Sequence, residues 1–181
     1  METLLSFLGF STIANSLWNT ASYVAFIAII IGVFSDRCRN MLITSGAIVL
    51  AVYAEVFLKN SLFATLQVLV VVSGILQWTK LSRHYAVTTM ATLTVVAYVF
   101  LYLNGAIADG YALVGSLGLL GIAFGLVALP KRYGFLFMAT GGVLLIIYAF
   151  HVTAWVFFFL NIFFTIANIH TWRKIRNGSV Q

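Results

Sequence analysis

The sequence predicts an all-α integral membrane protein with seven transmembrane helices. Hydrophobic residues make up 62% of the 181 positions, and charged residues make up only 8%. Soluble domains average about 25% charged residues, so this composition excludes a water-soluble globule. A disordered chain is excluded for the same reason, and the single cysteine, Cys38, excludes an internal disulfide framework. The third observation is that the apolar residues fall into stretches close to the roughly 20 residues that a spanning helix needs.

Helices are favoured over strands in every stretch. Many stretches carry β-branched residues, but in lipid each backbone N–H and C=O must be satisfied within its own segment, so length overrides propensity. A transmembrane barrel would show alternating segments of about 10 residues, and these runs do not alternate.

The N-terminal part of the chain predicts an interfacial segment followed by two spans. Residues 1–16 are apolar but contain no Lys or Arg, so they lack the basic leader of a secretory signal peptide. We expect a short interfacial helix there. The first span, 17–34, ends at the polar break Ser35–Asn40, and the second follows at 41–58.

The third and fourth predicted spans are separated by a short basic break. The third covers 61–79, begins after Lys59 and Asn60, and is followed by Lys80. The fourth covers 84–103 and ends at the polar break that follows it.

Three further spans complete the chain. The fifth covers 111–129 and ends before the turn-forming Pro130–Gly134. The sixth covers 135–150, and the seventh covers 152–172, after which the chain becomes basic again.

The basic residues predict the orientation in a cell membrane, inner or plasma. Nine of the ten would lie on one side, and only Lys59 would lie on the other. Because Lys and Arg near helix ends are retained in the cytoplasm, this split predicts a cytoplasmic C-terminus and an outer N-terminus. A nucleic-acid partner is excluded because no soluble domain carries the charge. The nine residues are Arg37, Arg39, Lys80, Arg83, Lys131, Arg132, Arg173, Lys174 and Arg176.

An internal repeat is predicted, with two parallel three-helix repeats at 17–79 and 111–175, a linker helix at 84–103 and a cytoplasmic tail at 176–181. Three helices followed directly by three more would place the second copy upside down in the membrane, and the linker helix gives both copies the same orientation. Transporters built from such parallel repeats bind substrate between their halves. The paired positions, 93 to 95 residues apart, are Gly32 and Gly125, Gly46 and Gly141, Tyr53 and Tyr148, Phe63 and Phe157, Gln67 and Asn161, and Trp78 and Trp172.

Amides inside the predicted spans indicate a substrate site. Gln67 and Asn161 each follow a phenylalanine by four residues, so Phe63 and Phe157 share their helix faces. Asn168 lies seven residues after Asn161, nearly on the same face. An amide suits a substrate with hydroxyls or a carboxamide, and an aromatic ring can stack on a flat, cationic heterocycle. The alternative is that these amides form hydrogen bonds between helices.

Three aromatic residues are weaker candidates for the same site. Tyr53 and Tyr148 each follow a glycine by seven residues, and either direct a hydroxyl inward or serve packing alone. Trp155 is either a belt residue at the membrane surface or a lid over the outer mouth. Glu55 lies near the outer end of its span, where it either snorkels to water or attracts cations.

Enzymatic chemistry has little support in the sequence. No catalytic triad, metal-binding spacing or nucleotide-binding motif is present, so no catalytic residue, metal ligand or cofactor is predicted. No carboxylate lies at mid-membrane to couple transport to an ion. Passive movement of a substrate down its gradient is the simplest mechanism.

The chain resembles the PnuC family of nicotinamide riboside transporters over residues 17–175. The likeness in the first half runs from Asn40-Met41-Leu42 through Gly46, Val52-Tyr53, Phe57, Leu62-Phe63-Ala64, Leu66-Gln67 and Gly74 to Trp78. In the second half it runs from Asp109 through Lys131-Arg132 and Tyr148 to Ile166-Ala167-Asn168-Ile169-His170-Thr171-Trp172-Arg173-Lys174.

This resemblance implies a fold like that of the SWEET sugar transporters and facilitated diffusion of a vitamin precursor that is trapped inside by phosphorylation. It also implies a homotrimer and places Gln67 in the Leu-Gln position of the third helix. Met41 and Thr65 stand where the family often has a Trp and an acid. The substrate therefore stays open between nicotinamide riboside, thiamine, riboflavin and a sugar, and a non-transporting scaffold or sensor subunit remains the alternative of another class.

Overall fold

The computed structural model describes residues 13–34, 38–79, 82–128 and 132–177, and these are helical with no strand. Residues 1–12 of the expected interfacial segment 1–16 lie outside the described residues, whereas residues 13–16 belong to α2 and extend the first predicted span. Most of the C-terminal tail also lies outside the described residues, as do Arg37, Lys80 and Lys131. In the described parts of the chain the helices are α2 (Ile13–Phe34), α3 (Arg39–Val52) with its extension η1 (Tyr53–Phe57), α4 (Ser61–Trp78), α5 (Arg83–Leu103), α6 (Gly110–Ala128), α7 (Arg132–His151) and α8 (Trp155–Arg176).

A helix occupies each of the seven places where the sequence predicts a span, taking α3 and η1 as one. Within the described residues, five are long and apolar enough to cross a membrane: Asn40–Phe57, Ser61–Trp78, His84–Leu103, Arg132–His151 and Trp155–Arg176. The apolar segments described for α2 and α6, Ser16–Gly32 and Gly110–Leu126, are somewhat shorter. Several helices extend beyond the predicted apolar stretches because polar or basic residues form their first or last turn, as in α7 (Arg132–His151) and α8 (Trp155–Arg176).

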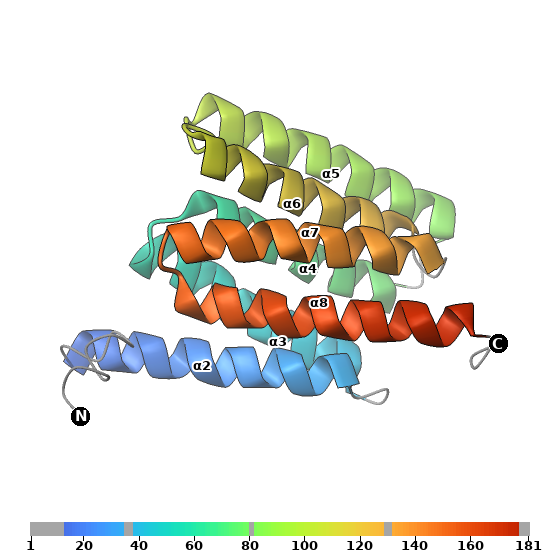
Figure 1. The fold of residues 1–181 in the computed structure, drawn as a ribbon, viewed down its shortest axis with the longest axis horizontal. Coiled ribbons are helices and arrows are strands. Elements are labelled where there is room, and N and C mark those ends of the chain that lie inside the picture. Colours follow the sequence, from blue (N-terminus) through green and yellow to red (C-terminus); the bar gives the residue numbers. More distant parts are fainter. Residues whose placement is uncertain (1–12, 35–37, 80–81, 129–131, 178–181) are drawn as a thin grey trace.

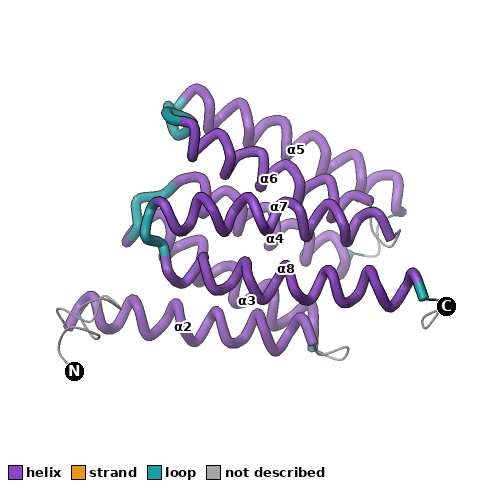
Figure 2. The backbone as a smooth tube through the Cα atoms, in the orientation of Figure 1, coloured by secondary structure: helices purple, strands orange, loops and turns teal. Residues whose placement is uncertain are grey.

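Successive helices run in alternating directions, so that α2, α4, α6 and α8 are parallel to one another (Figure 1). α3 packs between α2 and α4, and α7 packs between α6 and α8. These two groups meet along two edges, where α2 contacts α8 and α4 contacts α6. Figure 2 shows the described connections, between η1 and α4, between α5 and α6 and between α7 and α8, at one end of the bundle.

Helix α5 is the least enclosed of the predicted spans. Among the described residues it contacts mainly the neighbouring α4 and α6, and those contacts are sparse. Only 17% of its span is buried, against 50% for α7. Its side chains therefore contribute little to the protein interior and face mainly the surroundings.

Glycines allow the backbones of α6 and α7 to approach closely. A Cβ atom on Gly118 would lie 2.8 Å from the carbonyl oxygen of Gly141, and one on Gly141 would lie 2.7 Å from the backbone nitrogen of Ile122. Small residues at helix interfaces serve this purpose in membranes, where apolar burial alone does not bring helices together.

Two turns at one end of the bundle have the same unusual backbone. Lys59, between η1 and α4, has φ 50°, and Thr153, between α7 and α8, has φ 53°. Non-glycine residues rarely adopt this left-handed conformation. In both turns the next residue donates its backbone N–H to a carbonyl oxygen of the preceding helix. Asn60 donates to the carbonyl of Ala54, and Ala154 donates to the carbonyl of Ala149.

The π-helix η1 accommodates one additional residue before the first of these turns. The N–H of Leu58 donates to the carbonyl of Tyr53, five residues earlier, at 3.1 Å. Tyr53 lies six residues before Lys59, whereas Tyr148 lies five before Thr153. A π turn inside an α-helix takes up such an extra residue and occurs often at functional sites.

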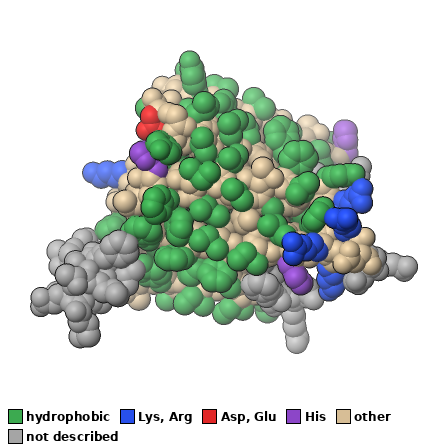
Figure 3. Space-filling view, viewed as in Figure 1, with side chains coloured by type: hydrophobic (Ala, Val, Ile, Leu, Met, Phe, Trp, Pro, Cys, Tyr) green, Lys and Arg blue, Asp and Glu red, His purple; other side chains and the backbone are tan. Residues whose placement is uncertain are grey.

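The surface is apolar along the length of the helices and basic at one end (Figure 3). Lys and Arg side chains gather near the C-terminal end of α8, where Arg173, Lys174 and Arg176 are exposed. The opposite end of the bundle carries Lys59. We call these the basic end and the Lys59 end.

Candidate functional site

Phe63 of α4 and Phe157 of α8 lie against each other in the interior. Each is the third residue of its helix, so the pair lies close to the Lys59 end. Their rings are 4.3 Å apart between centroids and only 7° from parallel, and both side chains are fully buried. Phe63 and Phe157, which the predicted repeat pairs at a spacing of 94 residues, are therefore in direct contact. The rings fill the space between them and leave none for a ligand in this arrangement.

A tyrosine flanks each phenylalanine on the other side. The ring of Tyr148 lies 5.2 Å from that of Phe63, and the ring of Tyr53 lies 6.4 Å from that of Phe157. Phe57 stacks on Tyr53 at 5.2 Å. Each tyrosine thus contacts the phenylalanine of the opposite three-helix group. We call Tyr53, Phe63, Tyr148 and Phe157 the aromatic cluster.

Gln67 and Asn161 lie one helical turn further from the Lys59 end. Each follows its phenylalanine by four residues, and α4 and α8 run in the same direction, so both amides lie on the helix faces that carry the stacked rings. Both side chains are 3% exposed. The structure therefore brings the two phenylalanines together and places each amide one turn along from its own ring.

The two amides differ in their hydrogen bonds. Asn161 donates from Nδ2 to the carbonyl of Phe157 at 2.7 Å, and Asn168 donates in the same way to Phe164 at 2.7 Å. These bonds lie within α8 and not between helices. The Gln67 side chain makes no such bond to its own helix, and its amide atoms are not among the fully enclosed atoms that lack a partner in the described residues. The small exposed fraction of this residue is therefore compatible with an amide that stays accessible to a small polar group.

The tyrosine hydroxyls of the aromatic cluster are bound by two asparagines that sequence reasoning did not include in the site. Tyr53 donates to Oδ1 of Asn19 in α2 at 2.8 Å. Asn60 donates from Nδ2 to the hydroxyl of Tyr148 at 2.9 Å. The sequence separations are 34 and 88 residues. A detectable signal for Asn60 was its place directly before an apolar run, which is typical of a helix N-cap.

Trp155 packs against other aromatic rings near the Lys59 end. Its ring packs edge-on against Phe150 and Phe158, at 6.0 and 5.8 Å, and all three belong to α7 and α8. These contacts place the tryptophan beside the connection between α7 and α8.

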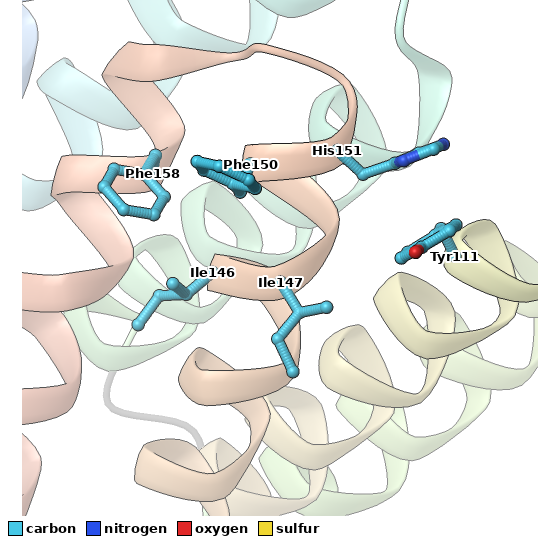
Figure 4. Close-up of a pocket in the computed structure, with 6 residues that line it drawn as sticks. All are labelled: Tyr111, Ile146, Ile147, Phe150, His151 and Phe158. Atoms are coloured by element: carbon cyan, nitrogen blue, oxygen red, sulfur yellow. The ribbon is translucent and has the colours of Figure 1, made fainter.

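A shallow groove opens beside this tryptophan on the surface formed by α6, α7 and α8 (Figure 4). Tyr111 stacks on His151 at its edge, with 3.8 Å between ring centroids and 9° between planes. The groove is lined by Tyr111, Ile146, Ile147, Phe150, His151 and Phe158. It lies on the outside of one half and does not reach between the halves.

Two buried hydroxyls also lack partners in the described parts of the chain, those of Thr44 in α3 and Thr165 in α8. Each lies against a glycine of the adjacent helix, Gly74 in α4 and Gly142 in α7. These hydroxyls sit where helices of the same half approach closely. No group of three or more His, Cys, Asp or Glu is placed to hold a metal ion in the residues described.

Comparisons with known proteins give no family for the chain: no family model, curated protein or solved structure matches it.

Proposed function

We propose that this chain is a passive membrane transporter that works by alternating access between residues 17–79 and 111–175. Its substrate would bind between α4 and α8, at Gln67 and Asn161. The resemblance of the sequence to the PnuC family makes a nicotinamide riboside-like pyridine nucleoside the proposed substrate, with facilitated diffusion as the mechanism and a homotrimer as the assembly.

The pattern of helix contacts supports two equivalent halves. Within each group the middle helix packs between the other two, α3 in one and α7 in the other. A two-fold axis that exchanges α2 with α6 and α4 with α8 also exchanges the α2–α8 contact with the α6–α4 contact. The sparsely packed α5 fits the role of a linker. This is the geometry expected of parallel repeats.

The turns support the same repeat. Lys59 and Thr153 are 94 residues apart and share the left-handed backbone, and Phe63 and Phe157 have the same spacing. Before the turns the spacing is 95, as for Tyr53 and Tyr148. The spacing changes from 95 to 94 residues because η1 holds one additional residue before the Lys59 turn.

The observation that carries the function is the pairing of two nearly buried amides, Gln67 and Asn161, with the stacked rings of Phe63 and Phe157. Polar side chains are costly inside a membrane, and they often mark substrate pathways. Gln67 and Asn161 occupy equivalent positions, each four residues after its phenylalanine. A carboxamide or ribose hydroxyl entering between the helices would bond to these amides, and the adjacent rings would receive a pyridinium.

The charge distribution supports the proposed orientation. Arg132, Arg173, Lys174 and Arg176 are exposed at the basic end, and Lys59 is exposed at the other. With the basic end in the cytoplasm, the aromatic cluster closes the path on the outer side. The described geometry then corresponds to a state sealed from the outside.

Uptake of labelled nicotinamide riboside into proteoliposomes tests the proposal. We expect saturable uptake by the native protein and its loss in a Gln67→Ala, Asn161→Ala double variant, because both substrate-facing amides are removed. Gln77→Ala, an exposed amide on the same α4, is the matched control and should transport normally.

Equal fluxes for the native protein and the double variant would refute the site. Competition by excess thiamine, riboflavin or a sugar, but not by unlabelled nicotinamide riboside, would reassign the substrate within the same transport class. Absence of any saturable flux, with copurification of a partner protein, would favour a scaffold or sensor subunit.

A further inference from the structure

Asn60 makes two side-chain hydrogen bonds that join the halves at the Lys59 end. Its Oδ1 accepts the backbone N–H of Phe63 at 3.1 Å and so caps the first turn of α4. Its Nδ2 donates to the hydroxyl of Tyr148 in α7 at 2.9 Å. One short side chain therefore binds the start of α4 in the first half and the end of α7 in the second.

These bonds fix the position of Phe63. The cap holds the turn that carries this ring, while the bond to Tyr148 holds the tyrosine ring that packs on it at 5.2 Å. Phe63 in turn stacks on Phe157 of the opposite half. Asn60, Tyr148, Phe63 and Phe157 thus form a continuous series of contacts across the boundary between the halves.

We propose that Asn60 is a positioning residue that latches the two halves together and thereby closes the substrate path at the Lys59 end. Its effect on transport rests on the proposed function, whereas its effect on the distance between the halves does not. Among the described residues the two groups of helices meet mainly along the α2–α8 and α4–α6 edges. Side-chain contacts such as this one therefore decide whether the Lys59 end stays closed.

The cap and the latch can be separated by substitution. Asn60→Ser retains an oxygen that caps a helix well but is too short to reach the tyrosine. Tyr148→Phe removes the hydroxyl and retains the ring that packs on Phe63. The two variants remove the same hydrogen bond from opposite sides, so one serves if the other fails to fold.

The separation of the halves is measured by pulsed electron resonance on the purified protein in lipid nanodiscs. Spin labels are placed at Lys59→Cys and Thr153→Cys, two exposed and equivalent positions in the two turns, in a Cys38→Ser background. We expect one narrow, short distance when the latch is intact. Either variant should raise the population at longer distance roughly three- to tenfold, the factor set by one net hydrogen bond.

A double-mutant cycle distinguishes a latch from two independent structural effects. The Asn60→Ser, Tyr148→Phe double variant should open no further than either single variant, because both remove one shared bond. Asn104→Ser, an exposed asparagine after α5, is the control and should leave the distribution unchanged. Unchanged distances in both single variants, or additive effects in the double variant, would overturn the proposal. Native-like uptake by the Gln67 and Asn161 variant would refute the transport site alone.

Discussion

Phe63 and Phe157 were identifiable from sequence because they hold matching positions in the predicted repeat, each four residues before an amide. Spacing alone placed Gln67 and Asn161 on the faces of these rings. It could not show that the rings close on each other, since that depends on the distance between two helices. Asn19 and Asn60 were missed because their tyrosine partners are remote in sequence.

Removing one ring of the stack should destabilise the protein strongly. Phe63 is fully buried and contacts both Phe157 and Tyr148, so Phe63→Ala leaves a cavity in the aromatic cluster. We expect a loss of about 3–5 kcal/mol in the free energy of unfolding in mixed micelles. Phe124→Ala, at a ring that is 58% exposed, should cost within about 0.5 kcal/mol. Similar losses for the two variants would contradict the packing described.

At the scale of the helices, length and apolar composition located each helix that the structure describes, but not the details of the helix ends. The break predicted at position 151 falls at Val152–Ala154 because α7 continues through His151. The π-helix η1 had no sequence signal beyond the change of one in the repeat spacing. The wider turn is stabilised by the Lys59 turn that follows it and by tertiary contacts, so local helix propensity does not predict it.

The closest helix pair should tolerate the least addition of volume. Gly141→Ala would place a Cβ against the backbone of Ile122, which cannot move aside as a flexible side chain can. We expect a loss of about 1–3 kcal/mol in the free energy of unfolding. Gly110→Ala, where nothing lies within 4 Å, is the matched control and should be nearly neutral. A neutral Gly141→Ala would show that α6 and α7 lie farther apart.

At the scale of the whole molecule, the apolar composition predicted an all-helical membrane protein, and the structure confirms the helices. The parallel-repeat arrangement and the orientation stay predictions. They were within reach of sequence because basic residues occur at alternate helix ends and because paired positions keep their order. The substrate was out of reach, since two amides and a few rings suit several small polar ligands.

The orientation can be tested with the single native cysteine. Cys38 is exposed at the basic end, so a membrane-impermeant maleimide should label it only after intact cells are permeabilised. A Cys38→Ser, Lys59→Cys variant should be labelled without permeabilisation. The reverse pattern would place the C-terminus outside and would turn the aromatic cluster toward the cytoplasm.

The π-helix has a consequence for how the gene can vary. One codon added to a regular helix turns every later side chain by about 100° around the axis. At Tyr53–Phe57 the wider turn takes up the additional residue before Lys59, so Asn60 and Phe63 keep their places. This short stretch is therefore where the membrane segment can gain or lose a codon while the contacts beyond it remain in register.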